Sequence, residues 1–160
     1  MFIIILFNIN CSTKDNTQYI INFDNEKFKI PIKIKDFKKQ HNLKYYVYIG
    51  FEGNTKNYTT ILQLESQPRW TGSDNSFEND YVNKTVVGIT FMSQENVYDS
   101  LRNNFEKHYK KKFDFINNIN KMKITNQITL IIRLYKNRTY ISYYYNIKEK
   151  DIYKYAKNVF

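Results

Sequence analysis

The sequence predicts an α+β fold: an antiparallel β-sheet of about five to seven strands, one main amphipathic helix packed on one face, and a short C-terminal helix. Apolar and polar residues alternate over several short segments between positions 19 and 147, which is the pattern of half-buried strands. In one stretch the period changes, and Val97, Leu101 and Phe105 recur every four residues, as they do on the buried side of a helix.

The first strands are predicted close to the N-terminal end. Residues 19–23 form a short strand, and Asp24 and Asn25 follow as a turn because both side chains can bond nearby backbone groups. Residues 28–35 alternate between an apolar residue and Lys, apart from one Pro, and are predicted to form a half-buried strand. Pro31 removes one ladder donor, which places this strand at a sheet edge or against a bulge.

A hairpin and a long loop are predicted next. Residues 36–42 form a polar connection, and residues 44–51 and 58–64 alternate and pair as antiparallel strands. Residues 65–80 form the longest segment without periodicity. A loop of this length inside a compact domain is often functional, so we expect contact residues there.

The main helix is predicted over Gln94–Lys110, after a strand over Val82–Phe91. Ser93 is the expected N-cap, and Glu95 lies in the first turn, where negative charge suits the helix dipole. The Lys residues at the other end of the helix also suit the dipole, so they need no ligand to explain them. Residues 117–126 are predicted to be a connector.

The last strands are the clearest. Gln127–Tyr135 is apolar on both faces, which is typical of a central strand, and we expect the main helix to pack across it. Lys136 and Asn137 can turn the chain into a final strand over Arg138–Ile147. Residues 152–159 fit a short closing helix.

The composition indicates one globular domain with a basic surface. The chain has 160 residues, of which 42% are hydrophobic and 25% charged, and this is enough for one core. The net charge of +10 suggests nucleic acid or an anionic membrane surface as a partner. However, the cations are dispersed among acids, and the A/T-rich codons of the abundant Ile, Asn, Lys, Tyr and Phe explain much of the charge. On a nucleic-acid-binding face the cations would be concentrated, so we expect no such face. We also expect the protein to be a monomer.

The N-terminal segment has a separate character. Met1–Asn10 is apolar and uncharged, and Cys11 is followed by an abruptly polar stretch. This arrangement resembles a bacterial lipoprotein signal, although no Lys or Arg precedes the apolar run. The resemblance implies that residues 1–16 are a signal and tether, that Cys11 carries a lipid, and that residues 17–160 form one domain in the cell envelope, periplasmic or at the surface. The alternative is the first strand of a cytoplasmic protein with an incidental Cys11.

The order of the later elements carries a second resemblance. A strand at 87–91, a helix with Leu101 and Phe105, a basic run at 108–112 and two further strands are similar to a module of small uncharacterised bacterial lipoproteins, such as those of Bacteroidetes. The resemblance implies an α+β fold and no catalytic activity.

No catalytic or metal-binding pattern is visible in the sequence. The two histidines, His41 and His108, lie in different predicted elements without metal-ligand spacing, and the single Cys cannot form an internal disulfide. No Gly-x-Ser-x-Gly elbow and no Gly-rich phosphate loop occurs. We therefore predict no catalytic residue, metal or cofactor. A hydrolase is a further alternative, which would need a cleft holding His41 or His108 beside a carboxylate.

The candidate contact residues are mostly aromatic. Arg69 and Trp70 lie in the long loop, and Tyr side chains suit interfaces because they combine apolar area with a polar tip. Four Tyr residues are candidates for one exposed sheet face, namely Tyr46, Tyr48, Tyr140 and Tyr144. The alternative is that the closing helix or loops cover this face.

Two functions follow from these observations. The first is a secreted or lipid-anchored domain that binds an unknown protein or glycan and associates with the membrane through Cys11. The second is a cytoplasmic basic protein that binds nucleic acid by stacking bases on Tyr rings bordered by Lys.

Overall fold

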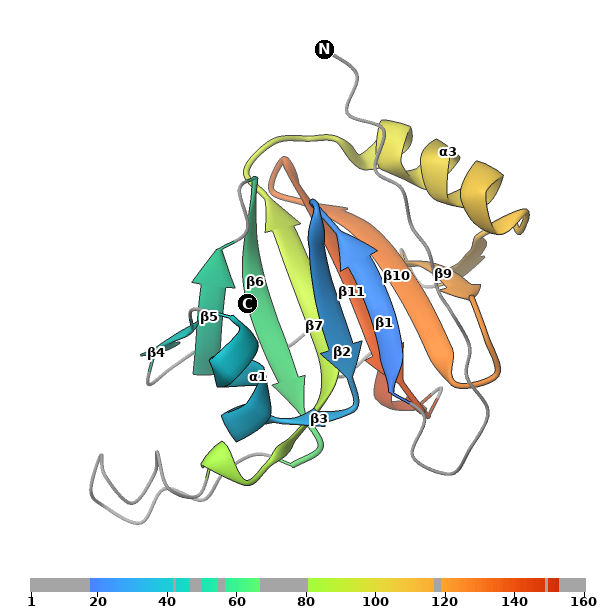
Figure 1. Ribbon diagram of the computed structural model, residues 1–160. Coiled ribbons are helices and arrows are strands. Elements are labelled where there is room, and N and C mark those ends of the chain that lie inside the picture. Colours follow the sequence, from blue (N-terminus) through green and yellow to red (C-terminus); the bar gives the residue numbers. More distant parts are fainter. Residues whose placement is uncertain are drawn as a thin grey trace.

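The computed structural model describes residues 18–41, 43–46, 50–54, 57–66, 81–116, 119–148 and 150–152, with the backbone alone for 43–46 and 50–54. It is an α+β structure built on one large antiparallel sheet, which confirms the predicted fold class (Figure 1). The strand order is β4-β5-β6-β7-β11-β10-β9-β8, and the short β3 also pairs with β7.

The strands of the large sheet are β3 (Ile32–Lys33), β4 (Leu43–Tyr46), β5 (Gly50–Asn54), β6 (Tyr58–Leu64), β7 (Thr85–Ser93), β8 (Asp114–Ile116), β9 (Ile119–Lys123), β10 (Ile128–Tyr135) and β11 (Arg138–Tyr145). Apart from the two-residue β3 and the three-residue β8, seven of these described strands remain, which agrees with the predicted five to seven. Every strand pair described in this sheet is antiparallel, and most pairs join strands that are consecutive in the chain.

A second layer covers one face of this sheet. It contains the hairpin of β1 (Tyr19–Phe23) and β2 (Glu26–Ile30), then α1 (Ile34–Gln40), and α3 (Tyr98–Tyr109) (Figure 1). The helix α3 contacts β10 and β11, as expected from the apolar pattern of β10. The main core therefore lies between this layer and the sheet.

Aromatic and aliphatic side chains fill the main core. Phe23 stacks on Phe91 with ring centroids 4.0 Å apart, and Phe28 meets Phe91 edge-on at 4.9 Å. Leu101 and Phe105 are the buried residues of α3, four residues apart as the sequence predicts. Asp24 fixes the β1–β2 turn to the sheet, since its carboxylate accepts hydrogen bonds from the Asn57 backbone N–H at 2.9 Å and side-chain amide at 2.7 Å.

Both turns predicted from Asx chemistry are confirmed. Asp24 and Asn25 join β1 to β2, and both have positive φ, 50° and 66°. Lys136 and Asn137 join β10 to β11 with φ of 48° and 60°. Two successive positive φ values match the twist of a tight hairpin.

The N-terminal half departs from the prediction in two places. The strand predicted over 28–35 ends at Ile30, and after Pro31 the chain forms β3 and then α1. Ile34 and Phe37 are both buried in α1, and their spacing of three places them on one face of a helix. The alternation of Ile32 and Ile34 had indicated a strand instead. The strand predicted over 44–51 consists of two paired strands, β4 and β5, in which Tyr46 opposes Gly50.

The C-terminal half departs from the prediction in two places. The main helix begins at Tyr98, and its N-cap is Val97 with no side-chain cap bond, so the prediction of Ser93 as N-cap is wrong. Ser93 instead ends β7 and accepts a hydrogen bond from the Glu95 N–H at 3.1 Å. The predicted connector 117–126 contains β9, whose Met122 is buried in the core. Residues 150–152 are helical, and the predicted closing helix falls almost entirely on residues 153–160, which lie outside the described residues.

Candidate functional site

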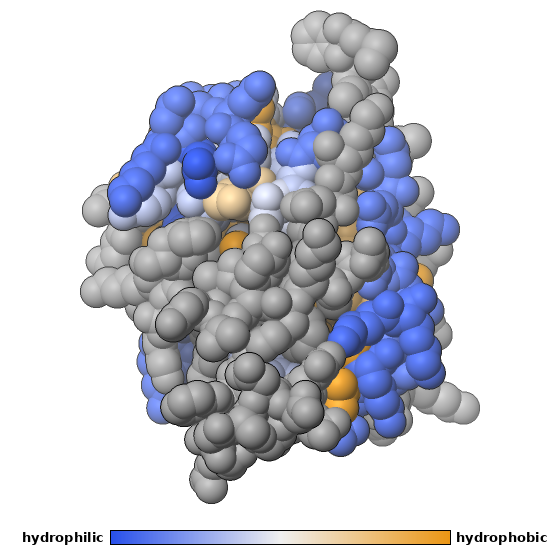
Figure 2. Space-filling view, turned by 90° about the vertical axis from the view of Figure 1, so that its left-hand side faces the viewer, coloured by the Kyte–Doolittle hydropathy of each residue, from blue (hydrophilic) through white to orange (hydrophobic). Residues whose placement is uncertain are grey.

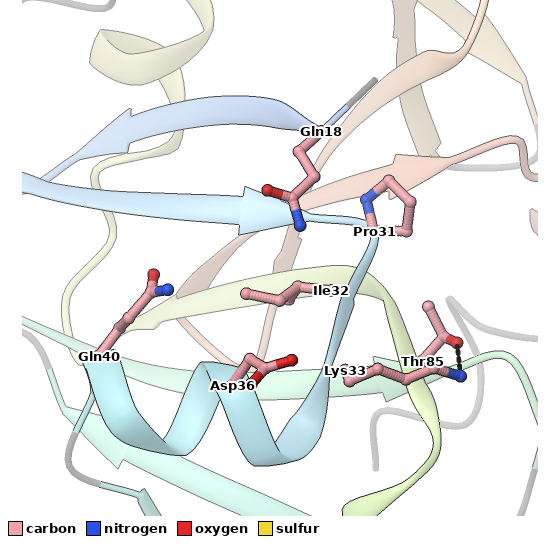
Figure 3. Close-up of a pocket in the computed structure, with 7 residues that line it drawn as sticks. All are labelled: Gln18, Pro31, Ile32, Lys33, Asp36, Gln40 and Thr85. Atoms are coloured by element: carbon pink, nitrogen blue, oxygen red, sulfur yellow. Dashed lines mark hydrogen bonds between the residues drawn. The ribbon is translucent and has the colours of Figure 1, made fainter. Parts of the chain in front are cut away.

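A polar hollow of about 350 Å³ lies beside α1 (Figure 3). It is lined by Gln18, Pro31, Ile32, Lys33, Asp36, Gln40 and Thr85. These residues come from the start of β1, the β2–β3 junction, α1 and the first residue of β7. From the β5 edge of the sheet, the described surface is largely hydrophilic, with small hydrophobic areas (Figure 2).

The charged groups of this hollow already have partners. Lys33 Nζ donates a hydrogen bond to Thr85 Oγ1 at 2.9 Å and lies 3.9 Å from Glu65 Oε1. Asp36 Oδ1 lies 3.6 Å from Lys39 Nζ, one turn along the helix. Neither His41 nor His108 lines the hollow, so it does not provide the His–carboxylate cleft that a hydrolase would need. The hollow offers polar contacts for a small ligand and no evident nucleophile.

A second candidate is the end of the β10–β11 hairpin. Residues 133–138, here called the basic tip, contain three cations and no acid. Leu134 and Tyr135 are exposed at 45% and 43%, although they continue the apolar run that is buried earlier in β10. Strand alternation points these two side chains to opposite faces, so both sides of the tip carry apolar surface. The tip is prominent at the upper end of the sheet in Figure 1.

Arginine and tyrosine side chains interact closely around this tip. The Arg133 guanidinium lies 4.8 Å from the centre of the Tyr140 ring and 6.0 Å from that of Tyr135. Lys136 Nζ lies 5.3 Å from the Tyr135 ring centre. Burial lowers the pKa of Arg133, while Tyr144, Tyr140 and Tyr135 raise it. An arginine remains charged under such conditions, so Arg133 adds a fixed positive charge behind the exposed apolar side chains.

Further exposed apolar residues lie on β8. Phe115 is 66% exposed and Ile116 38% exposed, and together we call them the β8 patch. With Leu134 and Tyr135 they are the large hydrophobic residues exposed among the residues that the structure describes. Their neighbour Asp114 is exposed and opposes Lys121 of β9 in register.

The predicted Tyr face lies on the side of the sheet opposite the main core. Tyr140 and Tyr144 of β11 are 3% and 2% exposed, so neither ring is available to a partner in this structure. Tyr144 packs with Ile119, Ile131, Ile147 and Ile152 in a small second cluster. Tyr46 lies in β4, but its side chain, and the residues Tyr48, Arg69, Trp70 and Cys11, lie outside what the structure describes.

A row of polar side chains crosses three strands beside these tyrosines. The Gln63 Nε2 amide donates to Thr90 Oγ1 at 2.7 Å, and the Thr90 and Ser142 hydroxyls are 2.7 Å apart. All three residues are buried, and Gln63 Oε1 has no hydrogen-bond partner. A Cβ added to Gly88 would lie 2.7 Å from Tyr144 Cδ1, so only glycine permits this close approach of the ring. The row joins β6, β7 and β11 at fixed register.

The two histidines have structural neighbours. The His41 ring stacks on Phe28 at 4.6 Å and contacts Phe37 at 4.5 Å, and its Nδ1 lies 3.4 Å from Glu26 Oε2. Burial lowers the pKa of His41, although Glu26 raises it. His108 lies near the end of α3, where burial lowers its pKa and its ring meets Tyr109 edge-on.

Comparisons with family models, with curated proteins and with solved structures find no match to this chain. Within the described ranges, no helix is both long and apolar enough to span a membrane. The same residues contain no group of three or more His, Cys, Asp or Glu side chains placed to hold a metal ion.

The basic tip is the feature that sequence reasoning missed. The signal was present, because the apolar run of β10 continues through Leu134 and Tyr135 up to the turn. The sequence Arg-Leu-Tyr-Lys-Asn-Arg at 133–138 also places three cations and no acid beside these two apolar residues.

Proposed function

We propose that this protein is a binding domain without catalytic activity, held in the cell envelope by a lipid on Cys11, and that its basic tip contacts an anionic partner. One observation carries the binding role: Leu134 and Tyr135 are exposed directly beside three cations. Exposed apolar residues with adjacent charge of one sign are typical of contact surfaces. The chain's net charge of +10 would favour the approach of an anionic partner.

The contacts of the polar hollow and of the histidines support a role in binding rather than in catalysis. Lys33 and Asp36 are engaged by neighbouring residues, and His41, which does not line the hollow, stacks on Phe28 and contacts Phe37. A general base needs to reach a substrate proton within hydrogen-bond distance. The described part of the chain places no His–carboxylate pair at the hollow.

The role of the tip can be tested on heparin, a soluble polyanion. The double variant Lys136→Ala/Arg138→Ala should elute from heparin at lower salt than the parent, because it loses two charges at the contact. Lys35→Ala/Lys148→Ala is the matched control, since it removes the same charge from exposed residues. Lys35 lies in α1 and Lys148 follows β11, at the other end of the sheet from the tip. Equal elution of both double variants would contradict a specific role for the tip.

The envelope location rests on Cys11 and is tested separately. Mass spectrometry of membrane-extracted protein should show a lipid-modified Cys11 at the mature N-terminus. An intact Met1 in the cytoplasmic fraction would contradict the lipid anchor. In that case, heparin binding by the tip would still have to be explained, and binding of nucleic acid in the cytoplasm would become the better hypothesis.

A further inference from the structure

We infer that the anionic partner of the basic tip is the headgroup surface of a lipid bilayer, which the tip and the β8 patch contact together. This inference rests on the proposed function, because it requires the tip to be the contact surface. It adds the identity of the partner and a second contact point that the charge argument does not use.

The sheet register places both sets of exposed apolar residues toward one end of the sheet. Ile116 pairs with Ile119 in β9, and the next residue of β9, Asn120, pairs with Ile132 of β10. Ile116 is therefore level with Arg133, the first residue of the tip. The strands β8 and β10 are separated by β9 alone, so the two sets lie about 10 Å apart across the sheet.

The distribution of these side chains fits a broad, flat partner better than a narrow one. Leu134 and Tyr135 are on opposite faces of one hairpin, while Phe115 and Ile116 are on opposite faces of another. A narrow groove or single strand would contact one face of one hairpin. A bilayer surface can receive the ends of both hairpins at once, with the apolar side chains at the boundary of the acyl chains and the cations at the headgroups.

The chemistry of the tip also distinguishes a membrane from nucleic acid. Bases stack on free aromatic faces, but the Tyr135 ring already has the charged groups of Lys136 and Arg133 within 5.3 and 6.0 Å. Leu134 and Ile116 have no aromatic ring and offer only apolar area. Aliphatic side chains beside cations match the acyl and phosphate layers of an anionic bilayer.

Vesicle binding by the full chain carrying Cys11→Ser tests the inference without a contribution from a lipid anchor. The probe is a vesicle of 30% phosphatidylglycerol in phosphatidylcholine, compared with pure phosphatidylcholine. We expect binding to the anionic vesicles, weakened about fivefold for each tip cation removed, hence about 25-fold for Lys136→Ala/Arg138→Ala. Lys35→Ala/Lys148→Ala should bind like the parent within about twofold.

The apolar contribution separates this inference from the proposed function. Leu134→Ser/Tyr135→Ser should lose about tenfold or more of its vesicle binding but keep its heparin elution, because heparin has no apolar layer. Leu134→Phe/Tyr135→Phe should restore vesicle binding. Phe115→Ser/Ile116→Ser should also weaken vesicle binding. These side chains are exposed, so unchanged circular dichroism and melting temperature are expected for every variant.

Each outcome decides one claim. If heparin elution depends on Lys136 and Arg138 but the Ser variants bind vesicles like the parent, the membrane inference is wrong and the proposed binding role stands. The same conclusion follows if the parent does not bind the anionic vesicles. If single-stranded DNA competes better than vesicles for the parent, nucleic acid is the partner. If neither probe depends on the tip, the membrane inference and the proposed binding role of the tip are both wrong.

Discussion

The two faces of the large sheet bury different chemistry. The face under β1–β2, α1 and α3 is filled by rings and aliphatic side chains, with Phe91 contacting Phe23, Phe28 and Tyr143. The opposite face carries the row of Gln63, Thr90 and Ser142, beside a small cluster around Tyr144.

This difference separates two requirements of a sheet. Apolar burial on the first face is non-directional and supplies most of the stability. Hydrogen bonds on the second face are directional, and each requires one alignment of neighbouring strands: Thr90 opposes Ser142, and Gln63 opposes Gly88 two residues away from Thr90. The first face therefore stabilises the fold, and the second specifies its register.

The largest effect is expected for Phe91→Ala on the first face. Phe91 is fully buried between three aromatic neighbours, so truncation leaves a cavity and should reduce the free energy of unfolding by about 3 to 5 kcal/mol. Chemical denaturation measures this loss. Tyr135→Ala is the matched control, since that exposed ring should change the free energy by less than about 0.5 kcal/mol. Similar losses in the two variants would contradict the location of the core.

A smaller loss is expected for Gly88→Ala on the second face. The new Cβ would lie 2.7 Å from Tyr144 Cδ1 and 2.9 Å from Gln63 Oε1, so the ring must shift away from β7. Overpacking of this kind should reduce the free energy of unfolding by about 2 to 3 kcal/mol. Adding Tyr144→Leu should recover part of the loss, because it removes the ring that the methyl group meets. If the two losses simply add, Tyr144 is not the obstacle.

The sequence was sufficient for the parts of the fold that local pattern controls. Three such features were predicted correctly: the strand over 128–135, the turn at Lys136 and Asn137, and the helix face with Leu101 and Phe105. The periodicity was ambiguous at Ile34, because its alternation with Ile32 fits a strand while its spacing of three from Phe37 fits one face of a helix. The prediction of Ser93 as N-cap was also wrong, because β7 extends through this residue and the helix begins later, at Tyr98.

The candidate sites were less predictable than the fold. Alternation could place Tyr140 and Tyr144 on one face but could not show that this face is buried, since burial depends on segments distant in sequence. The exposure of Leu134 and Tyr135 depends on where the covering layer ends, which no local pattern specifies. The β8 patch lies on a three-residue strand, too short for periodicity to reveal.

The polar row should respond to Thr90→Val with a loss of about 1 to 2 kcal/mol. Val keeps the shape of Thr but removes the hydroxyl that Gln63 and Ser142 bond, leaving the Gln63 amide buried without a partner. Urea denaturation measures the change. The triple variant Gln63→Leu/Thr90→Val/Ser142→Ala should be more stable than Thr90→Val alone, because replacing all partners leaves no orphaned group. A triple variant that is less stable would show that the row has more partners than these three.

The smallest effect is a pH dependence at His41, on the side of the main core. Burial lowers the folded-state pKa of His41 below its ordinary value of 6.5, so the neutral ring is favoured in the folded protein. Below about pH 6.5 His41 is protonated more readily in the unfolded chain than in the folded protein. The free energy of unfolding should therefore fall as the pH falls, by less than about 1 kcal/mol between pH 7 and pH 5.

His41→Phe keeps a ring beside Phe28 and Phe37 and cannot titrate, so its stability should depend less on pH over this range. His108→Phe is the matched control for the other histidine, whose pKa burial also lowers. Because Glu26 opposes the effect of burial, Glu26→Gln should steepen the pH dependence, and a shallower slope in that variant would mean that the Glu26 charge does not act on this ring.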